Sequence, residues 1–280
     1  MKLFNLHTHT HFCDGSDEPE AYVKAAIKQN FSSLGFSGHA PMPFENKYAI
    51  PQDRLAEYMN EIDRLKQKYA GQIHLLKSLE FDYIPGVTED FKLIIDKFNL
   101  DYSIGSIHLI GNQNTEQYWF TDGGSEIPYD KGLQKNYKGD IRRAVKDYFQ
   151  QICQMVDTQN PEVIGHLDKV KMHNKNRYFT EDESWYQKEV DQCLDLIKSQ
   201  NSIVEVNTRG LYKKRSDSLF PGVEVLKKMW KLNIPVTISS DAHKPEELAL
   251  FIPETIELLK QIGLTKVLNF EKNWIEVPLK

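Results

Sequence analysis

Short β-rich runs alternate with amphipathic helical patterns along the whole chain, and this alternation constrains the fold more than any other feature. Seven runs have the composition of strands, at residues 2–6, 34–37, 73–79, 102–106, 162–164, 203–206 and 235–239. Six segments between them carry apolar residues at helical spacing, at residues 20–29, 53–69, 88–98, 140–156, 181–199 and 222–231. Such alternation predicts βαβ units, and therefore an α/β fold around a parallel sheet that is either open or closed.

The length of the chain suits one closed sheet. The 280 residues are close to the roughly 250 that a single α/β barrel needs, so we expect one domain over residues 1–280. After the seventh run, residues 245–263 predict a helix that Pro253 breaks, and residues 266–279 predict a hairpin or an edge strand. The stretch from 109 to 139, rich in Gly, Asn and aromatic residues, predicts a functional loop such as a lid.

The composition of the chain limits the kinds of partner and the cellular location that we expect. The net charge is -5, so the chain lacks the basic surface expected of a general nucleic-acid binder. No apolar stretch reaches the roughly 18 residues of a membrane span. Three widely spaced cysteines, and a start without the features of a secretory signal, predict a reducing, cytoplasmic location. We therefore expect a small substrate, and neither nucleic acid nor a membrane as partner, while the sequence gives no indication of the oligomeric state.

Residue types that bind metals gather at the C-terminal ends of the predicted strands. Six of the nine histidines follow a strand directly, namely His7, His9, His39, His108, His166 and His243. Glu80 and Asp241 have the same position after the third and seventh strands. In a parallel barrel these ends converge on one rim, which is where the active sites of such folds are built.

Two motifs place pairs of potential ligands on one strand face. His7 and His9 are two residues apart, so both side chains leave an extended chain on the same side, and Asp241 and His243 repeat this spacing. Asp14 is a possible ninth ligand beside the eight residues that follow strands. Nine nitrogen and oxygen ligands are too many for one ion and suit two or three divalent ions, whether zinc, iron or manganese.

Several other residues near these motifs have simpler interpretations. His11 continues the alternation, but the turn towards Asp14 interrupts the strand before it, so we expect a spare histidine, with a substrate contact as the alternative. We expect His173 to face solvent and Cys13 to be a plain small residue beside the site. The basic residues after the sixth strand either add positive field or are solvated surface: Lys213, Lys214 and Arg215.

Short motifs spread over nearly the whole chain carry a family resemblance. They are HTHT with CDG, GFSGHAP, LEFDYIP, GSIHLI, VIGHLDKVK, EVNTRGL and SSDAHKPEEL, in this order. Together they resemble the PHP (polymerase and histidinol phosphatase) superfamily, and more closely its histidinol-phosphate phosphatases. The resemblance implies a distorted TIM-like (β/α)7 barrel with a metal site at the C-terminal ends of the strands.

The resemblance also implies three metal positions. The first would take His7, His9, Glu80 and Asp241. Glu80 would bridge to the second, which would also take His108 and His166. The third would take His39, His243 and Asp14, for which Asp17 and Glu18 are the nearby alternatives.

The activity implied is that of a metal-dependent phosphomonoesterase, a histidinol-phosphatase of histidine biosynthesis that converts L-histidinol phosphate to L-histidinol and phosphate. A hydroxide bridging two ions attacks phosphorus, since the ions lower the pKa of water towards about 7. Arg209 is expected to clamp a phosphate oxygen. Either Asp241 or a metal-bound water is expected to supply the proton that the leaving alcohol needs. The residues expected to bind the substrate are Arg209, Asn207, Lys169 and Lys171.

Three other functions compete with this one. A related PHP phosphoesterase that hydrolyses nucleotides or another small phosphate monoester would have the same ligands. An amidohydrolase also begins with HxH on a barrel strand, but usually has a bridging lysine on the fourth strand, where this chain has His108. A metal-binding module without activity would be expected to lack some ligands, whereas here every position is filled.

Overall fold

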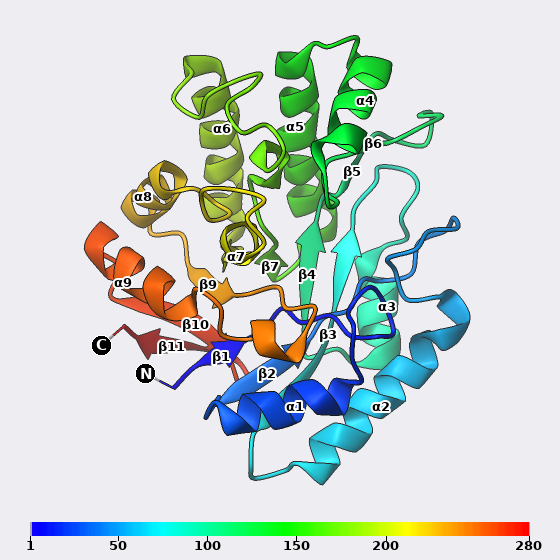
Figure 1. Ribbon diagram of the computed structural model, residues 1–280, viewed down its shortest axis with the longest axis vertical. Helices are drawn as coiled ribbons and strands as arrows, with labels where there is room; N and C mark the ends of the chain where they lie inside the picture. Colours follow the sequence, from blue (N-terminus) through cyan, green and yellow to red (C-terminus); the bar gives the residue numbers. More distant parts are fainter. Residues whose placement is uncertain (1, 280) are drawn as a thin grey trace.

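A parallel sheet of seven strands forms the centre of the molecule (Figure 1). The structure is a computed structural model that describes residues 2–279. The strands lie in the order β1 (Phe4–Asn5), β2 (Ser33–Phe36), β3 (His74–Asp82), β4 (Tyr102–Ser106), β7 (Val163–Ile164), β8 (Ile203–Asn207) and β9 (Val236–Ser239). Each of them overlaps one of the seven predicted runs, which are confirmed.

The first and last strands of the sheet meet, so the sheet curves into a nearly closed barrel. Beyond β1 and β9, Thr8 and Ala242 form a parallel bridge. The His9 amide donates to the Ala242 carbonyl at 2.8 Å, and the Ala242 amide donates to the His7 carbonyl at 3.1 Å. The predicted distorted (β/α)7 barrel is confirmed, while the extent of one domain over residues 1–280 stays a prediction.

Helices join successive strands and cover the outside of the barrel (Figure 1). They are α1 (Pro19–Lys28), α2 (Leu55–Lys68), α3 (Phe91–Phe98), α5 (Ile141–Gln159), α6 (Ser184–Gln200), α8 (Val223–Leu232) and α9 (Ile252–Ile262). In α2 the buried residues Tyr58, Ile62 and Leu65 recur at helical spacing and form the face turned to the core. Among residues 2–279, no helix is long and apolar enough to cross a membrane.

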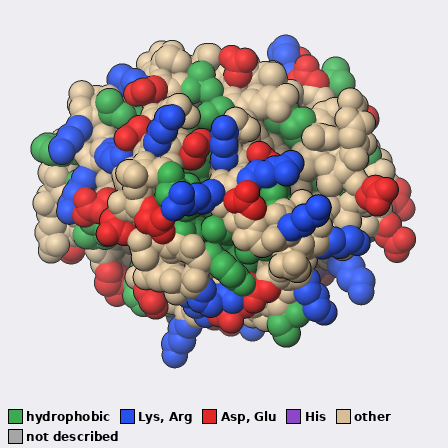
Figure 2. Space-filling view, turned by 90° about the horizontal axis from the view of Figure 1, so that it is seen from above, with side chains coloured by type: hydrophobic (Ala, Val, Ile, Leu, Met, Phe, Trp, Pro, Cys, Tyr) green, Lys and Arg blue, Asp and Glu red, His purple; other side chains and the backbone are tan. Residues whose placement is uncertain are grey.

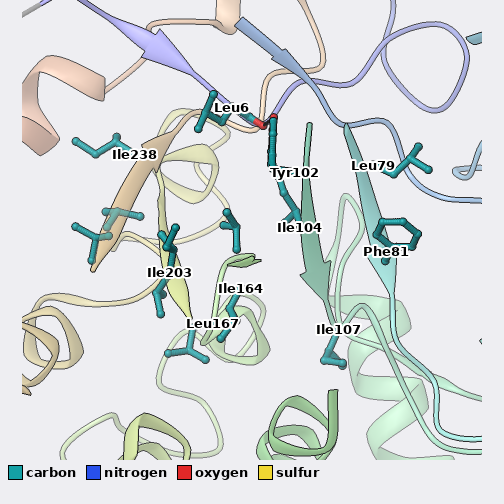
Figure 3. Packing of buried hydrophobic residues seen from close by; sticks show 14 of the residues in the cluster. Leu6, Leu79, Phe81, Tyr102, Ile104, Ile107, Ile164, Leu167, Ile203 and Ile238 are labelled. Atoms are coloured by element: carbon teal, nitrogen blue, oxygen red, sulfur yellow. Dashed lines mark hydrogen bonds between the residues drawn. The ribbon is translucent and has the colours of Figure 1, made fainter. Parts of the chain in front are cut away.

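Apolar side chains fill the interior of the barrel below the ends of the strands (Figure 3). Leu76, Ile104 and Val163 come from three different strands, face the inside of the barrel and are each at most 1% exposed. The Tyr102 hydroxyl donates to the Leu6 carbonyl, which ties β4 to the end of β1. The polar residues that follow the strands therefore stand on a close-packed core and not over a pore.

The C-terminal segment differs from the prediction at one point. The helix expected over 245–263 is divided into η3 (Pro245–Glu247) and α9, and Pro253 lies in the first turn of α9. A proline is tolerated there because the first backbone amides of a helix need no partner within it. The break therefore precedes Pro253. The predicted hairpin is present as β10 (Lys266–Phe270) and β11 (Trp274–Pro278).

The prediction of a long loop over residues 109–139 is wrong, because this stretch contains secondary structure of its own. It holds the antiparallel pair β5 (Leu109–Ile110) and β6 (Trp119–Phe120), followed by α4 (Glu126–Tyr137). Pro128 and Gly132 are residues that usually disfavour a helix, so the sequence pattern does not indicate α4. Pro128 is tolerated because it lies in the first turn of the helix. At Gly132 a side chain would overlap the Trp119 ring, which is fully buried. The helix thus depends on a tertiary contact.

Candidate metal centre

The nine predicted ligand side chains lie together at the C-terminal end of the barrel. They are His7 and His9 after β1, Asp14 in the turn that follows, His39 after β2, Glu80 in β3, His108 after β4, His166 after β7, and Asp241 and His243 after β9. The parallel bridge between His39 and Glu80 extends the pairing of β2 and β3 and holds these two residues side by side. Eight of the nine are buried, whereas the Asp14 side chain is 34% exposed.

The first group of atoms lies where β1 and β9 meet. His9 Nε2 is 3.3 Å from Asp241 Oδ1 and 3.4 Å from Glu80 Oε2. His7 Nε2 is 3.2 Å from the same Glu80 oxygen and 3.8 Å from Asp241 Oδ1. Two imidazole nitrogens and two carboxylate oxygens thus face one point, as the predicted first metal position requires.

Glu80 connects this group to a second. Its Oε1 lies 3.0 Å from His166 Nε2 and 3.7 Å from His108 Nε2. Its Oε2 lies 3.1 Å from His39 Nδ1. The carboxylate is therefore central to the cluster, with different histidines on its two oxygens, which is the arrangement of a bridging ligand.

The third group gathers around Asp14 at the open side. His243 Nε2 lies 3.2 Å from both Asp14 oxygens, and His39 Nε2 lies 3.8 Å from Oδ1. His9 Nδ1 also approaches, at 3.6 Å from Oδ1. Asp14, and not Asp17 or Glu18, is the acidic residue that meets these histidines.

Carboxylates and a carbonyl fix the outward nitrogens of three of the imidazole rings. His7 Nδ1 is 2.5 Å from Glu205 Oε1, and His108 Nδ1 is 3.0 Å from Asp82 Oδ1. His243 Nδ1 is 3.1 Å from the Asp241 carbonyl. Because an acceptor faces each Nδ1, the proton of the neutral ring belongs there, and Nε2 presents its lone pair to the centre.

Glu205 and Asp82 were not predicted as site residues, although they lie in the motifs EVNTRGL and LEFDYIP. Asp82 follows Glu80 by two residues, and Glu205 precedes Asn207 by two, so strand periodicity puts each pair on one face. That signal could have identified them as supports of the ligand histidines. Their partners depend on which strands are neighbours in the barrel.

The central atoms fit a cation better than they fit one another. His7 Nε2, His9 Nε2, His39 Nδ1 and Asp241 Oδ1 are buried and have no hydrogen-bond partner. When their rings are neutral, His7 and His108 both turn a lone pair to oxygens of Glu80, itself an acceptor when ionised. Such an arrangement of acceptors is stable when positive charge lies between them, which divalent ions supply.

Burial and neighbouring charges shift the pKa values of the residues in the cluster. Burial lowers the pKa of His9 to about 4, and the neighbouring His243 acts in the same direction. Burial alone would raise the pKa of Asp241, but His7 and Arg209 hold it well below its usual value. At neutral pH the site therefore contains ionised carboxylates and a neutral His9, which are the forms that bind metals.

A cavity of about 130 Å³ opens directly above the cluster. Four predicted ligands line one side of it, namely Asp14, His39, His108 and His243. Arg209 and Arg215 bring positive charge to the wall, and Tyr48 and Phe120 bring aromatic surface. We call this space the catalytic cavity, since it is the place from which a small molecule reaches the cluster.

Arg209 and Lys169 carry their charges beside the ligands. The Arg209 Nη1 donates to the Asp241 carbonyl at 2.8 Å, and its guanidinium is 11% exposed. Lys169 Nζ pairs with Asp122 Oδ2 at 2.6 Å. Asp122 comes from the segment before α4 and was not predicted. Burial lowers the pKa of Lys169, but Asp122, Asp241 and Glu80 together outweigh burial and raise this pKa.

Two predicted substrate contacts receive no support from the geometry. The Asn207 amide nitrogen is buried and donates to Glu205 at 3.0 Å and Asp241 at 3.2 Å, which uses both of its hydrogens. Lys171 Nζ is also buried and pairs with Asp168 at 2.8 Å and Glu181 at 2.9 Å. Neither residue lines the catalytic cavity.

His11, Cys13 and His173 lie near the predicted ligands but differ in burial and in their contacts. Within residues 2–279, His11 belongs to none of the candidate metal groups and approaches Glu18 at 3.3 Å. Cys13 Sγ lies 3.5 Å from His9 Nδ1, beside the cluster. The prediction that His173 faces solvent is wrong, because its side chain is 2% exposed and its Nε2 lies 3.2 Å from the Gly123 carbonyl.

Comparison with known proteins gives consistent matches. The sequence profile of the PHP domain matches residues 5–209. Histidinol-phosphatase from Bacillus subtilis is 28% identical, with 87% of this chain and 94% of that protein covered. The crystal structure of histidinol phosphate phosphatase from Lactococcus lactis, complexed with zinc, L-histidinol and phosphate, is 22% identical and superposes with a TM-score of 0.69 over 98% of this chain and 99% of that one. A crystal structure from Listeria monocytogenes, also 22% identical, reaches a TM-score of 0.79 over 90% of this chain and 99% of that one.

Proposed function

The chain belongs to the PHP domain family, and from this premise we propose that it is a metal-dependent histidinol-phosphatase. It hydrolyses L-histidinol phosphate to L-histidinol and phosphate, a step of histidine biosynthesis. One observation carries the proposal: nine potential ligands, with Glu80 central among them, lie below a small cavity that is also lined by arginine. Relatives named histidinol-phosphatase match over nearly the full length of both chains.

We assign the ligands to two or three divalent ions. His7, His9, Glu80 and Asp241 would hold the first ion, Glu80 with His108 and His166 the second, and Asp14, His39 and His243 the third. When bound, the ions would lower the pKa of water and neutralise negative charge on the phosphoryl oxygens. Zinc, iron and manganese all suit these ligands, and the zinc in the Lactococcus lactis structure favours zinc.

The chain's own cations orient the phosphate. Arg209 is held on the Asp241 carbonyl and on Tyr212, so its remaining donors point into the catalytic cavity, where they bind a phosphate oxygen. Lys169, fixed by Asp122, lies close enough to Glu80 and Asp241 to add to this field. Arg209 binds the dianion before any bond changes and holds it in one orientation, whereas Lys169 is buried outside the lining of the catalytic cavity and contributes only positive charge.

Asp241 transfers a proton from the attacking water to the leaving alcohol. Because the pKa of Asp241 is held well below its usual value, this carboxylate is ionised and accepts the proton of the attacking water. It then returns the proton to the oxygen of the leaving alcohol, which keeps the proton balance of hydrolysis. Asn207 donates to the other oxygen of Asp241 and orients it, so we assign this residue a positioning role.

The proposed partners are a small phosphorylated substrate, and neither nucleic acid nor a membrane, with a cytoplasmic location. On the face drawn in Figure 2, Lys and Arg side chains are interspersed with Asp and Glu, without a continuous basic surface. An extended polyanion binds through such a surface. A small dianion needs only the cations of the catalytic cavity.

The test is a comparison of phosphate esters with metal-loaded enzyme whose ion content is measured. We expect kcat/KM for L-histidinol phosphate to exceed that for nucleoside monophosphates by at least about tenfold, which corresponds to about 1.4 kcal/mol of discrimination. A chelator should abolish turnover, and zinc, iron or manganese should restore it. Equal or faster turnover of nucleoside monophosphates would favour the alternative PHP phosphoesterase.

A further inference from the structure

A second and larger cavity lies next to the catalytic cavity. Its volume is about 470 Å³, and Arg215 lines both spaces. Three segments that are distant in sequence form its wall, namely residues 124–126 at the start of α4, His173 and Lys175 after η2 (Lys169–Lys171), and residues 213–215 at the end of α7 (Arg209–Tyr212). We call this space the basic cleft. Gly123 lines the catalytic cavity and Gly124 the basic cleft, so the two also adjoin through the backbone.

The lining of the basic cleft carries more positive than negative charge. Its cations are Lys175, Lys213, Lys214 and Arg215, and its one acidic residue is Glu126. Glu126 pairs with Lys175 at 2.8 Å, Lys213 pairs with Glu247, and Arg215 lies 3.6 Å from Asp122. Within residues 2–279 the exposed Lys214 ammonium has no carboxylate partner. Positive charge is therefore left over, and it attracts an anionic group.

One local feature leaves a polar group available in the basic cleft. Ser125 precedes α4, and its hydroxyl makes no capping hydrogen bond. The hydroxyl is thus free for a ligand at an end of α4 that favours negative charge.

The geometry points to a second anion site: we propose that the basic cleft binds a second phosphate or carboxylate group of a ligand whose phosphate monoester occupies the catalytic cavity. Arg215 contacts both groups. The inference rests on the proposed function only for the phosphate in the catalytic cavity. It extends the substrates to phosphate monoesters with a second anionic group, and hydrolysis again consumes water and releases an alcohol and phosphate.

The test uses metal-loaded enzyme and alkyl phosphates with chains of two to six carbons that end in a phosphate, a carboxylate or a hydroxyl. At the best chain length we expect KM for an anionic end to be about tenfold below that for a hydroxyl end. The phosphate and carboxylate series show which anion is preferred. Equal KM values for all three ends at every length would overturn the proposal.

Charge-reversal variants locate the effect. Lys214→Glu should reduce the ratio of the two KM values about fivefold, the scale of one partly exposed charge contact. The matched control Lys272→Glu makes the same change in charge at the exposed turn between β10 and β11, and should leave the ratio unchanged. Equal effects of both variants would mean that general surface charge, and not the basic cleft, sets the preference.

Calorimetric binding of non-hydrolysable phosphonates separates this inference from the proposed function. Tighter binding of a bisphosphonate than of a monophosphonate, in an enzyme that does not hydrolyse L-histidinol phosphate, supports the basic cleft and refutes the proposed function. Equal affinity in an enzyme that does hydrolyse it refutes the basic cleft alone.

Discussion

Glu205 Oε1 lies 2.5 Å from Nδ1 of the fully buried His7. This contact keeps the proton of the neutral ring on Nδ1, so that Nε2 faces Glu80 and Asp241 with its lone pair. Glu205 also accepts hydrogen bonds from the His166 amide and from Ser239. One carboxylate beneath the site thus orients parts of β1, β7 and β9 at once.

The first prediction concerns this carboxylate. Glu205→Gln keeps the size of the side chain but offers an amide that can donate to His7, which favours the wrong tautomer. We expect metal affinity to fall by about tenfold to a hundredfold, the usual effect of losing a group that orients a ligand histidine. Competition with a fluorescent chelator measures it. The exposed Glu254→Gln is the control, and equal affinity in both variants would contradict the role of Glu205.

A pair of histidine variants tests which imidazoles of the N-terminal motif bind metal. His9→Ala should lose bound ion, because its two nitrogens lie 3.3 Å from Asp241 and 3.6 Å from Asp14. His11→Ala should keep the ion content of the natural protein, since within residues 2–279 His11 belongs to no candidate metal group and approaches the exposed Glu18. Elemental analysis of the two purified proteins decides the matter, and a loss of ion from His11→Ala would show that the motif holds three ligands.

The ligands could be located from the sequence because strand ends converge in a parallel barrel whatever the details of packing. Asp122 could not be found in this way, because its partner Lys169 belongs to a distant segment that only the tertiary fold brings beside it. Asn207 and Lys171 were predicted to bind the substrate, whereas carboxylates beside them occupy their polar atoms. Alternation and strand ends are local signals, but the partner of a charged side chain depends on tertiary neighbours.

Metal affinity should depend on pH through His108. Although burial lowers its pKa, Asp82 and Glu80 outweigh burial and raise the pKa of His108 to about 9 in the protein without metal. An ion can bind only the neutral ring, so below pH 9 binding must displace a proton. Apparent affinity should therefore rise with pH, by about tenfold per unit for the proton of His108, whose contribution levels off above about 9. His7 adds to the rise, because Glu205, Glu80 and Asp241 together outweigh burial and raise its pKa.

A variant makes the pH prediction specific. Asp82→Asn removes the counter-charge, so the pKa of His108 falls and the rise in affinity should end at a lower pH. Titration calorimetry in buffers of different ionisation enthalpy counts the released protons directly. Asp53→Asn, at an exposed position, is the control. Affinity that is constant between pH 7 and 9 would show that His108 is already neutral.

Gly132→Ala tests the packing of α4. In an unhindered helix this change stabilises by about 1 kcal/mol. Here the new methyl group would overlap the buried Trp119 ring, so we expect a loss of about 1–3 kcal/mol, seen as a lower Tm. Lys131→Ala, on the exposed neighbouring position, should leave Tm nearly unchanged. A higher Tm for Gly132→Ala would mean that α4 does not pack on Trp119 as described.

Variants of Arg209 distinguish a role in substrate binding from a role in metal binding. Its Nη1 is held by the Asp241 carbonyl, while the guanidinium lines the catalytic cavity. Arg209→Ala should lower kcat/KM by about a hundredfold, the scale of charge-assisted hydrogen bonds of about 1.5–3 kcal/mol, and leave the ion content intact. Arg209→Lys should recover only part of the loss, because an ammonium cannot form the planar fork. Arg64→Ala, on the exposed α2 surface, is the control. Loss of ion from Arg209→Ala would instead assign Arg209 to the support of Asp241, and unchanged kcat/KM would remove it from the site.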